Sequence, residues 1–562
     1  MYPLHMDSGA NSKYLGLYVL ATSAVVCLLV TPLNSIDPVS LPKLCLLVVL
    51  SFTGVGFAFS IVEFFRTKKN RLAVSLIGLF LAQLFLVFLL DDQEFSLRFY
   101  GTFGRNTGFI AYVSLSFLLL ASLISASRDM LKRYAVAILG VGTTLAIYGV
   151  SQSKGNDFYQ FNNAYETNVF GTFGNPNFQS AFMGIVAAVA FTVVFYSKIK
   201  IIFKAALLLL IFLALYNISL SSQQGNLNFG AGIAFATVIF LLKSKRPILG
   251  WIMAAISGTT GILIGLGVLN IGPLADVIYK SSLQARGFYW RAAVKMMFEH
   301  PFFGVGMDGY GDAYLRSRTS EIASINAGIT ADSAHNIPLD IGSSGGFPLL
   351  LAYISIIALV VMSIVRVIKR QTEFDVVFTA IAAAWVAYQV QSLISINQLG
   401  LGVWGWSLSG LIIGYDLNTH PDTEGIIHKS VRPGNLKAQK ISALAVVFTF
   451  VATTTGIAIA APPYLAANRF YKALQSGDPS IIQQSAYLKP YDRMRFLYVA
   501  QALQENKFES GAINVLRDAT AIYPDAIDLW RRWEGIPSAS LSDIARAKAE
   551  IMRLDPNNPN LG

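Results

Sequence analysis

The sequence predicts an all-helical membrane protein: a bundle of about 12 to 13 transmembrane helices, a large polar loop and a C-terminal helical-repeat domain. The 562 residues are 54% hydrophobic and only 13% charged, a composition more apolar than that of a soluble globular chain. Apolar runs of about 18 residues or more, long enough to cross the hydrocarbon layer as helices, recur up to residue 461. These two observations define a polytopic membrane protein.

The apolar stretches are the predicted membrane spans, in order along the chain. The eighth is short and the twelfth is rich in glycine, so these two are the weakest. The stretches lie near residues 14–32, 41–62, 72–90, 108–126, 133–150, 180–197, 201–219, 228–242, 249–269, 345–365, 376–395, 399–415 and 441–461.

Lysine and arginine gather in every second connection between these spans. The basic connections hold about twenty such residues and the alternate ones, apart from residues 270–344, about four. Because short basic loops stay in the cytoplasm, we expect the N-terminus inside and, with an odd number of spans, the C-terminus outside. The net charge of +11 then reflects topology, so no nucleic-acid partner is expected. The basic connections are 66–71, 128–133, 198–204, 243–246, 366–370 and 429–440.

A polar insert, residues 270–344, separates the ninth and tenth spans and falls on the predicted outer face. Arg286 and Arg291 flank an aromatic cluster, which fits an interfacial helix, although a guanidinium fork also suits two phosphate oxygens. His335 is able to accept a proton near neutral pH. His300 is expected to belong to a structural turn that ends at Gly306.

Three further polar segments lie next to spans on the same predicted face. The first runs from Gly171 to Asn177 and fits either a helix-entry turn or a set of amides facing a polar ligand. The segment from Ser221 to Gly225 is expected to be a polar turn. Arg105 is either a snorkelling anchor or a ligand of a lipid phosphate.

After Pro462 and Pro463 the composition changes to soluble amphipathic helix as far as Gly562. Small and aromatic residues recur there at helix-packing spacing, which resembles degenerate tetratricopeptide hairpins, while an ordinary helical bundle remains the alternative. The predicted domains are therefore a membrane domain, residues 1–461, and an outward-facing helical domain, residues 462–562, that is suited to gripping a protein partner.

Taken in order, the outward-facing motifs resemble those of the O-antigen ligase and polymerase superfamily, bacterial membrane glycosyltransferases with a C-type fold. The resemblance extends over residues 100–415, and tetratricopeptide-like tails also occur in members of this superfamily. The matching residues are Gly171 to Asn177, Arg286 with Tyr289 and Trp290, Pro301 to Gly306, and Ala334 to Asn336 with Leu339 and Gly346.

This resemblance implies transfer of a glycan from an undecaprenyl diphosphate carrier to an acceptor at the outer face of the bacterial cytoplasmic membrane. It implies no cofactor and no metal, and no cluster of outward carboxylates is expected to hold one, since Asp308, Asp312 and Asp332 are expected to be isolated. Arg286 would clamp the diphosphate and His335 would orient or deprotonate the acceptor. The remaining residues expected to bind substrate are Arg105, Arg291, Asn175, Asn177, Gln224 and Asn336.

The chain departs from the family pattern at two positions. Members usually carry Ser-Arg-Gly where this chain has Gln223, Gln224 and Gly225. Members also often carry an acidic residue after the histidine, at the position that Ser344 occupies in this chain. The sequence leaves open a ligase, a polymerase of O-antigen or exopolysaccharide, and a protein O-oligosaccharyltransferase. A lipid-glycan transporter would instead carry ionisable residues within its spans, which are almost free of them.

Overall fold

The structure is a computed structural model that describes residues 8–31, 36–58, 64–65, 67–158, 169–278, 281–325, 327–419 and 443–561. Within these ranges the chain is helical and contains no strand. Each stretch predicted as a span contains a helix within the described residues. These helices are α1 (Ser8–Leu28), α2 (Ser40–Ala58), α4 (Arg71–Leu90), α6 (Phe109–Ser125), α7 (Arg128–Ser153), α8 (Pro176–Tyr196), α9 (Ile201–Ser221), α10 (Gln224–Leu242), α11 (Pro247–Val268), α16 (Ile337–Arg370), α17 (Val376–Ile394), α18 (Leu399–Asn418) and α20 (Ala443–Ser476).

Ten helices of the described chain are long and apolar enough to cross a membrane, by length and composition. The apolar parts of α1 and α6 are shorter, and the glycine-rich α18 is not among the ten. Glycine in α18 serves close packing instead, since a Cβ on Gly410 would lie 2.1 Å from the carbonyl oxygen of Leu119 in α6. The all-helical membrane fold is therefore confirmed with about ten clear spans.

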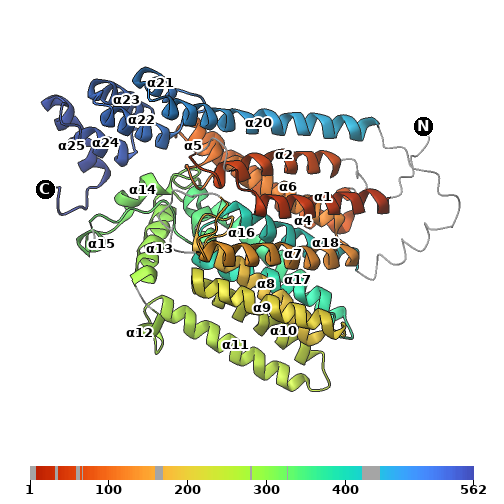
Figure 1. Cartoon of the computed structure of the whole chain (residues 1–562). Helices are drawn as coiled ribbons and strands as arrows, with labels where there is room; N and C mark the ends of the chain where they lie inside the picture. Colours follow the sequence, from red (N-terminus) through yellow and green to blue (C-terminus); the bar gives the residue numbers. More distant parts are fainter. Residues whose placement is uncertain are drawn as a thin grey trace.

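The helices lie side by side in one bundle (Figure 1). Of the most apolar part of α8, 83% is buried, against 6% of the corresponding part of α11. Helix α8 thus belongs to the core of the bundle and α11 lies at its edge. The core continues through α18, in which every residue from Leu399 to Asp416 is buried.

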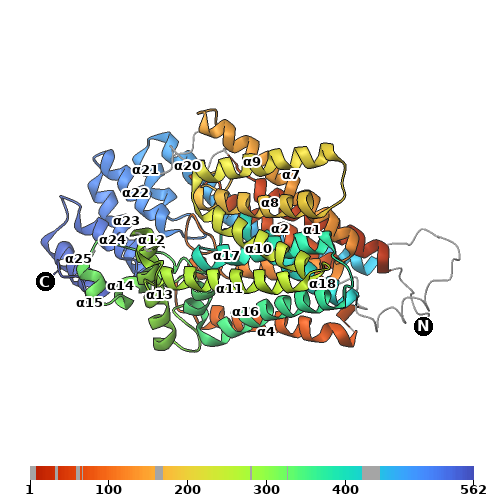
Figure 2. The same cartoon turned by 90° about the horizontal axis from the view of Figure 1, so that it is seen from below.

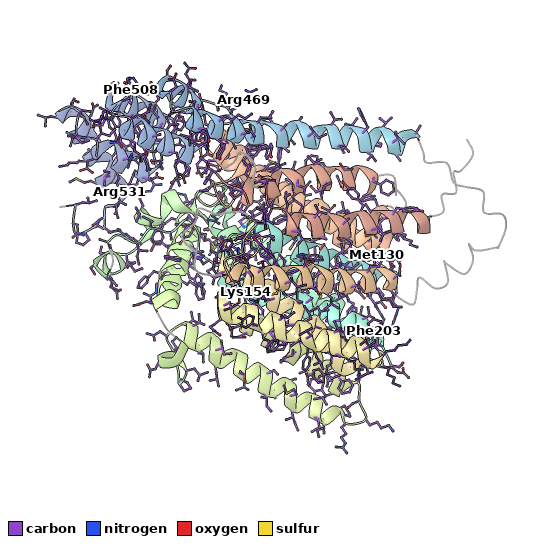
Figure 3. The ribbon with its side chains drawn as sticks, viewed as in Figure 1. Met130, Lys154, Phe203, Arg469, Phe508 and Arg531 are labelled. Atoms are coloured by element: carbon purple, nitrogen blue, oxygen red, sulfur yellow. The ribbon has the colours of Figure 1, made fainter. Side chains whose placement is uncertain are left out.

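Successive helices run in opposite directions, so their connections alternate between the two ends of the bundle. Figure 3 shows Met130 and Phe203, near the starts of α7 and α9, at one end, and Lys154, just after α7, at the other. The basic connections 128–133 and 198–204 therefore share one end. The polar insert lies at the opposite end, the end of Lys154 (Figures 1 and 2).

The polar insert forms four helices rather than an extended loop, and the C-terminal region lies at the same end of the bundle (Figure 2).

Helix α20 continues through Pro462 and Pro463, so the change in composition after these prolines falls inside a helix. The C-terminal helices share a core around Trp530 and Trp533, which Leu97 of α5 (Phe95–Tyr100) joins. The elements are α12 (Ala275–Ile278), α13 (Ser281–Glu299), α14 (Tyr310–Ser317) and α15 (Ser320–Ile325) in the insert, and α21 (Pro479–Ser485), α22 (Arg493–Glu505), α23 (Glu509–Ile522), α24 (Ile527–Glu534) and α25 (Leu541–Leu554) in the C-terminal region.

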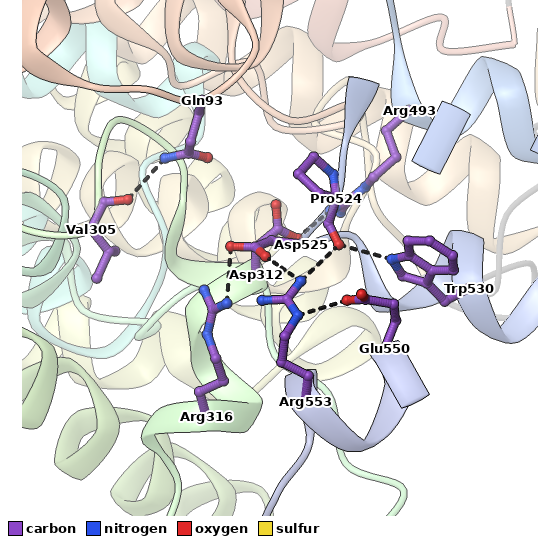
Figure 4. Close-up of polar contacts among 10 residues, drawn as sticks. All are labelled: Gln93, Val305, Asp312, Arg316, Arg493, Pro524, Asp525, Trp530, Glu550 and Arg553. Atoms are coloured by element: carbon purple, nitrogen blue, oxygen red, sulfur yellow. Dashed lines mark hydrogen bonds and ion pairs between the residues drawn. The ribbon is translucent and has the colours of Figure 1, made fainter. Parts of the chain in front are cut away.

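Ion pairs join the C-terminal helices to the polar insert. Arg316 of α14 donates to Asp525 over 2.9 Å, and Arg493 of α22 pairs with Asp312 of α14 (Figure 4). Asp312 is thus not an isolated carboxylate. These contacts hold the polar insert against the C-terminal region.

Candidate functional site

The polar insert is fixed to α16 by a close contact between two stretches of backbone. Helix α16 is broken at Gly346, where φ is 70°. The backbone N–H of Val305 donates to Ser343 over 2.8 Å, and that of Phe347 donates to the carbonyl of Pro301 over 2.8 Å. A Cβ on Gly346 would lie 2.5 Å from the same Pro301 oxygen, so the approach requires glycine. The turn that contains His300 and Gly306 is therefore structural, as the sequence indicated.

His335 lies immediately before the first turn of α16. Asn336 caps that helix: its side-chain oxygen accepts from the N–H of Leu339 over 3.0 Å and its amide donates to Leu393 over 2.8 Å. The backbone of His335 has a φ of 50°, a left-handed conformation that non-glycine residues seldom adopt. Its imidazole lies against the ring of Tyr289 in α13, with ring centroids 5.5 Å apart. Both ends of the Asn336 amide are thus used within the protein, whereas the His335 ring faces α13.

Arg286 lies one turn before Tyr289 on the same helix and supplies a positive charge near His335. Its side chain is partly buried and forms no ion pair with any carboxylate that the structure describes. Burial lowers the pKa of Arg286, and the neighbouring Tyr289 acts in the opposite direction. Arg291, which the sequence also predicted to bind substrate, is exposed on α13. Of the two arginines on α13, Arg286 is therefore the one whose charge acts on His335.

Burial lowers the pKa of His335 to about 4, and the positive charge of Arg286 adds to this effect. Asp332 acts in the opposite direction, but more weakly. A histidine with this pKa is neutral at pH 7, so one ring nitrogen is free to accept a proton.

Arg105 lies in the connection before α6 and is held by two carboxylates. Its guanidinium is 3.8 Å from Asp308 and 3.8 Å from Asp332, and it also donates to the backbone carbonyl of Asp332. Asp308 in turn accepts from the N–H of Thr102 over 2.6 Å and from the hydroxyl of Thr107 over 2.9 Å. Asp308 and Asp332 are not isolated from other charged groups, contrary to expectation, because folding brings both to one arginine whose side chain is only 8% exposed. Arg105 ties the turn before His335 to the connection before α6.

Asp340, in the first turn of α16, is a residue near the site that sequence reasoning missed. One carboxylate oxygen accepts from the N–H of Ala334 over 2.7 Å, and the other is buried without a hydrogen-bond partner among the described residues. The family pattern directed attention to Ser344, one helical turn further on. The available signal was an acidic residue in the first turn of the helix that follows His335.

The remaining predicted residues have capping and packing contacts. The side-chain oxygen of Asn175 accepts from the N–H of Asn177 over 2.9 Å at the start of α8. Gln224 is buried at the start of α10, where its amide donates to Gln391 of α17. The polar groups gathered around His335 are therefore Arg286, Tyr289 and the Arg105 cluster.

Residues 177–354 match the family model described as O-Antigen ligase. The match begins at the start of α8 and ends within α16, so it contains Arg286 and His335 but not Arg105. No curated protein matches the chain. Among the residues that the structure describes, no three His, Cys, Asp or Glu side chains form a group that could hold a metal ion.

Proposed function

We propose that this chain is a glycosyltransferase of the O-antigen ligase type, which moves a glycan from undecaprenyl diphosphate to an acceptor hydroxyl. The observation that carries the proposal is the pair of His335 and Arg286: a neutral imidazole next to a cation that has no carboxylate partner among the described residues. The match of residues 177–354 to the O-antigen ligase family supports the same class of reaction.

In the proposed reaction the bond between the sugar anomeric carbon and the diphosphate oxygen breaks. A new bond forms between that carbon and the acceptor oxygen, and undecaprenyl diphosphate leaves with the electron pair. His335 takes the acceptor proton, and Arg286 stabilises the charge that develops on the departing diphosphate. Since the donor carries its own leaving group, the protein contributes positioning and charge stabilisation.

We place the site at the outer face of the membrane. The basic connections 128–133 and 198–204 lie at the end of the bundle opposite the polar insert, and basic loops are retained in the cytoplasm. Ser510→Cys, exposed at the start of α23, should be labelled from outside by a membrane-impermeant thiol reagent, whereas Lys245→Cys should be labelled only after the membrane is opened. The reverse pattern would contradict this orientation.

The experiment that tests transfer uses liposomes with a lipid-linked glycan donor and the purified full-length protein. Wild type is compared with Arg286→Ala and, as a matched control, with Arg469→Ala, an exposed arginine at the same end of the molecule (Figure 3). A new glycosidic bond in wild type and Arg469→Ala, with a strong loss in Arg286→Ala, is expected. Movement of the carrier between leaflets without a new bond would favour the transporter alternative instead.

The product distinguishes the reactions within the class. A ligase joins a finished glycan to another lipid, a polymerase lengthens the glycan on its carrier, and a protein O-oligosaccharyltransferase modifies a hydroxyl of a protein. We place ligase-type transfer first, and mass analysis of the product in the same liposomes separates the three.

A further inference from the structure

A cavity of about 760 Å³ lies between the end of α4, the polar insert and the C-terminal helices. Its volume falls within the range of sites that take small ligands, about 300 to 1,000 Å³. Its wall includes the segment from Gly304 to Ala313, and the same segment carries Asp308, which pairs with Arg105. The cavity is thus separated from the Arg105 cluster by a single stretch of chain.

Most acidic side chains of the cavity wall are already engaged by the protein. Asp91 accepts from the N–H of Met307 over 2.9 Å, and Glu94 caps α5. Asp312 and Asp525 pair with Arg493 and Arg316, respectively. These four carboxylates therefore build the cavity and leave little capacity for a ligand.

Of the other wall groups, Asp92, Gln93 and Glu299 offer hydrogen-bond acceptors, while the exposed imidazole of His300 can donate as well as accept. Asp92 is exposed and forms no ion pair with a described residue, and Glu299 has only a 3.7 Å contact with Lys295. The amide of Gln93 donates to Val305 over 2.8 Å, while its side-chain oxygen is buried without a partner. Figure 4 shows this oxygen turned away from Val305, toward the C-terminal helices.

A ligand for this wall must bring hydrogen-bond donors and an apolar face. Donors are required because a buried acceptor without a partner costs free energy. The exposed ring of Phe303 lines the same cavity and offers an apolar surface to the face of a sugar ring. Hydroxyl and ammonium groups satisfy these demands. Phosphate and carboxylate groups, which accept hydrogen bonds and carry negative charge, are repelled by Asp92 and Glu299.

We infer that this cavity binds a saccharide segment of the acceptor, one that carries hydroxyl or amino groups and no negative charge. The inference rests on the proposed function, which requires an acceptor, and it deepens that function by giving the acceptor a site. The donor diphosphate and the acceptor saccharide would then be sorted by charge. Arg286 attracts the diphosphate, and the acidic cavity on the other side of the Gly304 to Ala313 segment takes the sugar.

The test measures binding by isothermal titration calorimetry to the full-length protein in nanodiscs, without donor and without turnover. The probes are a glucosamine trimer, an N-acetylglucosamine trimer and a galacturonic acid trimer. The variant Asp92→Asn/Glu299→Gln removes two exposed carboxylates of the wall, so folding is retained. The control is Glu373→Gln, which changes an exposed carboxylate at the opposite end of the bundle.

Wild type and the control should bind the cationic trimer most tightly, the neutral trimer more weakly and the anionic trimer not at all. The double variant should bind the cationic trimer at least about tenfold more weakly, because two charge-assisted hydrogen bonds are lost. Equal binding by wild type and the double variant, preference for the anionic trimer, or no binding of any trimer would overturn the inference. Because binding is measured apart from transfer, glycan transfer without saccharide binding rejects only this inference. Binding without transfer rejects only the proposed function.

Discussion

The guanidinium of Arg318 donates a hydrogen bond of 2.7 Å to the carboxylate of Asp555, and both side chains are fully buried. Arg318 follows α14 in the polar insert, and Asp555 follows α25 near the C-terminus. Asn557 strengthens the same junction by donating to the carbonyl of Arg318 over 2.8 Å. The C-terminal helices therefore brace the insert that carries Arg286.

Asp555→Ala should destabilise this junction by about 3 to 5 kcal/mol, because it leaves a buried guanidinium without its carboxylate. The measurement is chemical unfolding of the purified protein, followed by the intrinsic fluorescence of its seven tryptophans, which include Trp530 and Trp533 in the C-terminal core. The double variant Arg318→Met/Asp555→Leu should recover most of the loss, since it removes both charges. Asp129→Ala, which breaks an exposed ion pair with Arg133, serves as the control and should change little. A loss no larger than the control's would contradict the bracing role.

Gly346→Ala should disturb the break in α16. The new Cβ would lie 2.5 Å from the carbonyl oxygen of Pro301, and φ is 70° at this position. Strain of this kind costs about 1 to 3 kcal/mol, and it would displace the helix that begins after His335. The matched control is Gly265→Ala in α11, where a Cβ meets no atom within 4 Å. The melting temperature and the transfer rate should both fall in Gly346→Ala and stay unchanged in Gly265→Ala. Equal behaviour of the two variants would contradict the requirement for glycine at the break in α16.

Arg105→Lys separates two roles for this arginine. The guanidinium is shared between Asp308, Asp332 and a backbone carbonyl, so we expect it to position the turn before His335. Lysine lacks the planar fork, and kcat should fall about tenfold or more while the KM for the donor changes less than about twofold. A raised donor KM with unchanged kcat would instead identify Arg105 as a diphosphate ligand, as the sequence predicted.

The pH dependence of transfer should reflect the lowered pKa of His335. Since burial and Arg286 bring this pKa to about 4, the imidazole remains neutral as the pH falls from 8 through 6.5. The value of kcat/KM should therefore stay level over that range and decline only toward more acidic pH. Arg286→Gln removes a neighbouring positive charge, so the pKa of His335 should rise and the acid limb of any residual activity should move to higher pH. A wild-type acid limb near pH 6.5 would contradict this assignment.

The sequence was sufficient for the features that depend on local composition. Apolar length predicted each helix of the bundle, although the burial of the glycine-rich α18 depends on its neighbours and is not visible in hydropathy. His335 and Arg286 could be singled out as candidate site residues from the sequence, because their chemistry and the order of their motifs stand out in a polar segment. The Arg105 cluster was not, because Arg105 meets Asp308 and Asp332 only through tertiary folding. The same holds for Gln224, whose partner Gln391 lies on another helix.

The claim that His335 takes the acceptor proton during glycan transfer can be tested by a single-turnover measurement in liposomes. Undecaprenyl diphosphate release and new glycosidic bonds are followed together for wild type and His335→Ala, with donor binding measured separately. We predict that wild type releases one carrier for each glycosidic bond formed. In His335→Ala the transfer rate should be lower by about 100-fold or more, with a donor affinity within about twofold of that of wild type. Equal single-turnover rates in the two proteins would contradict the claim.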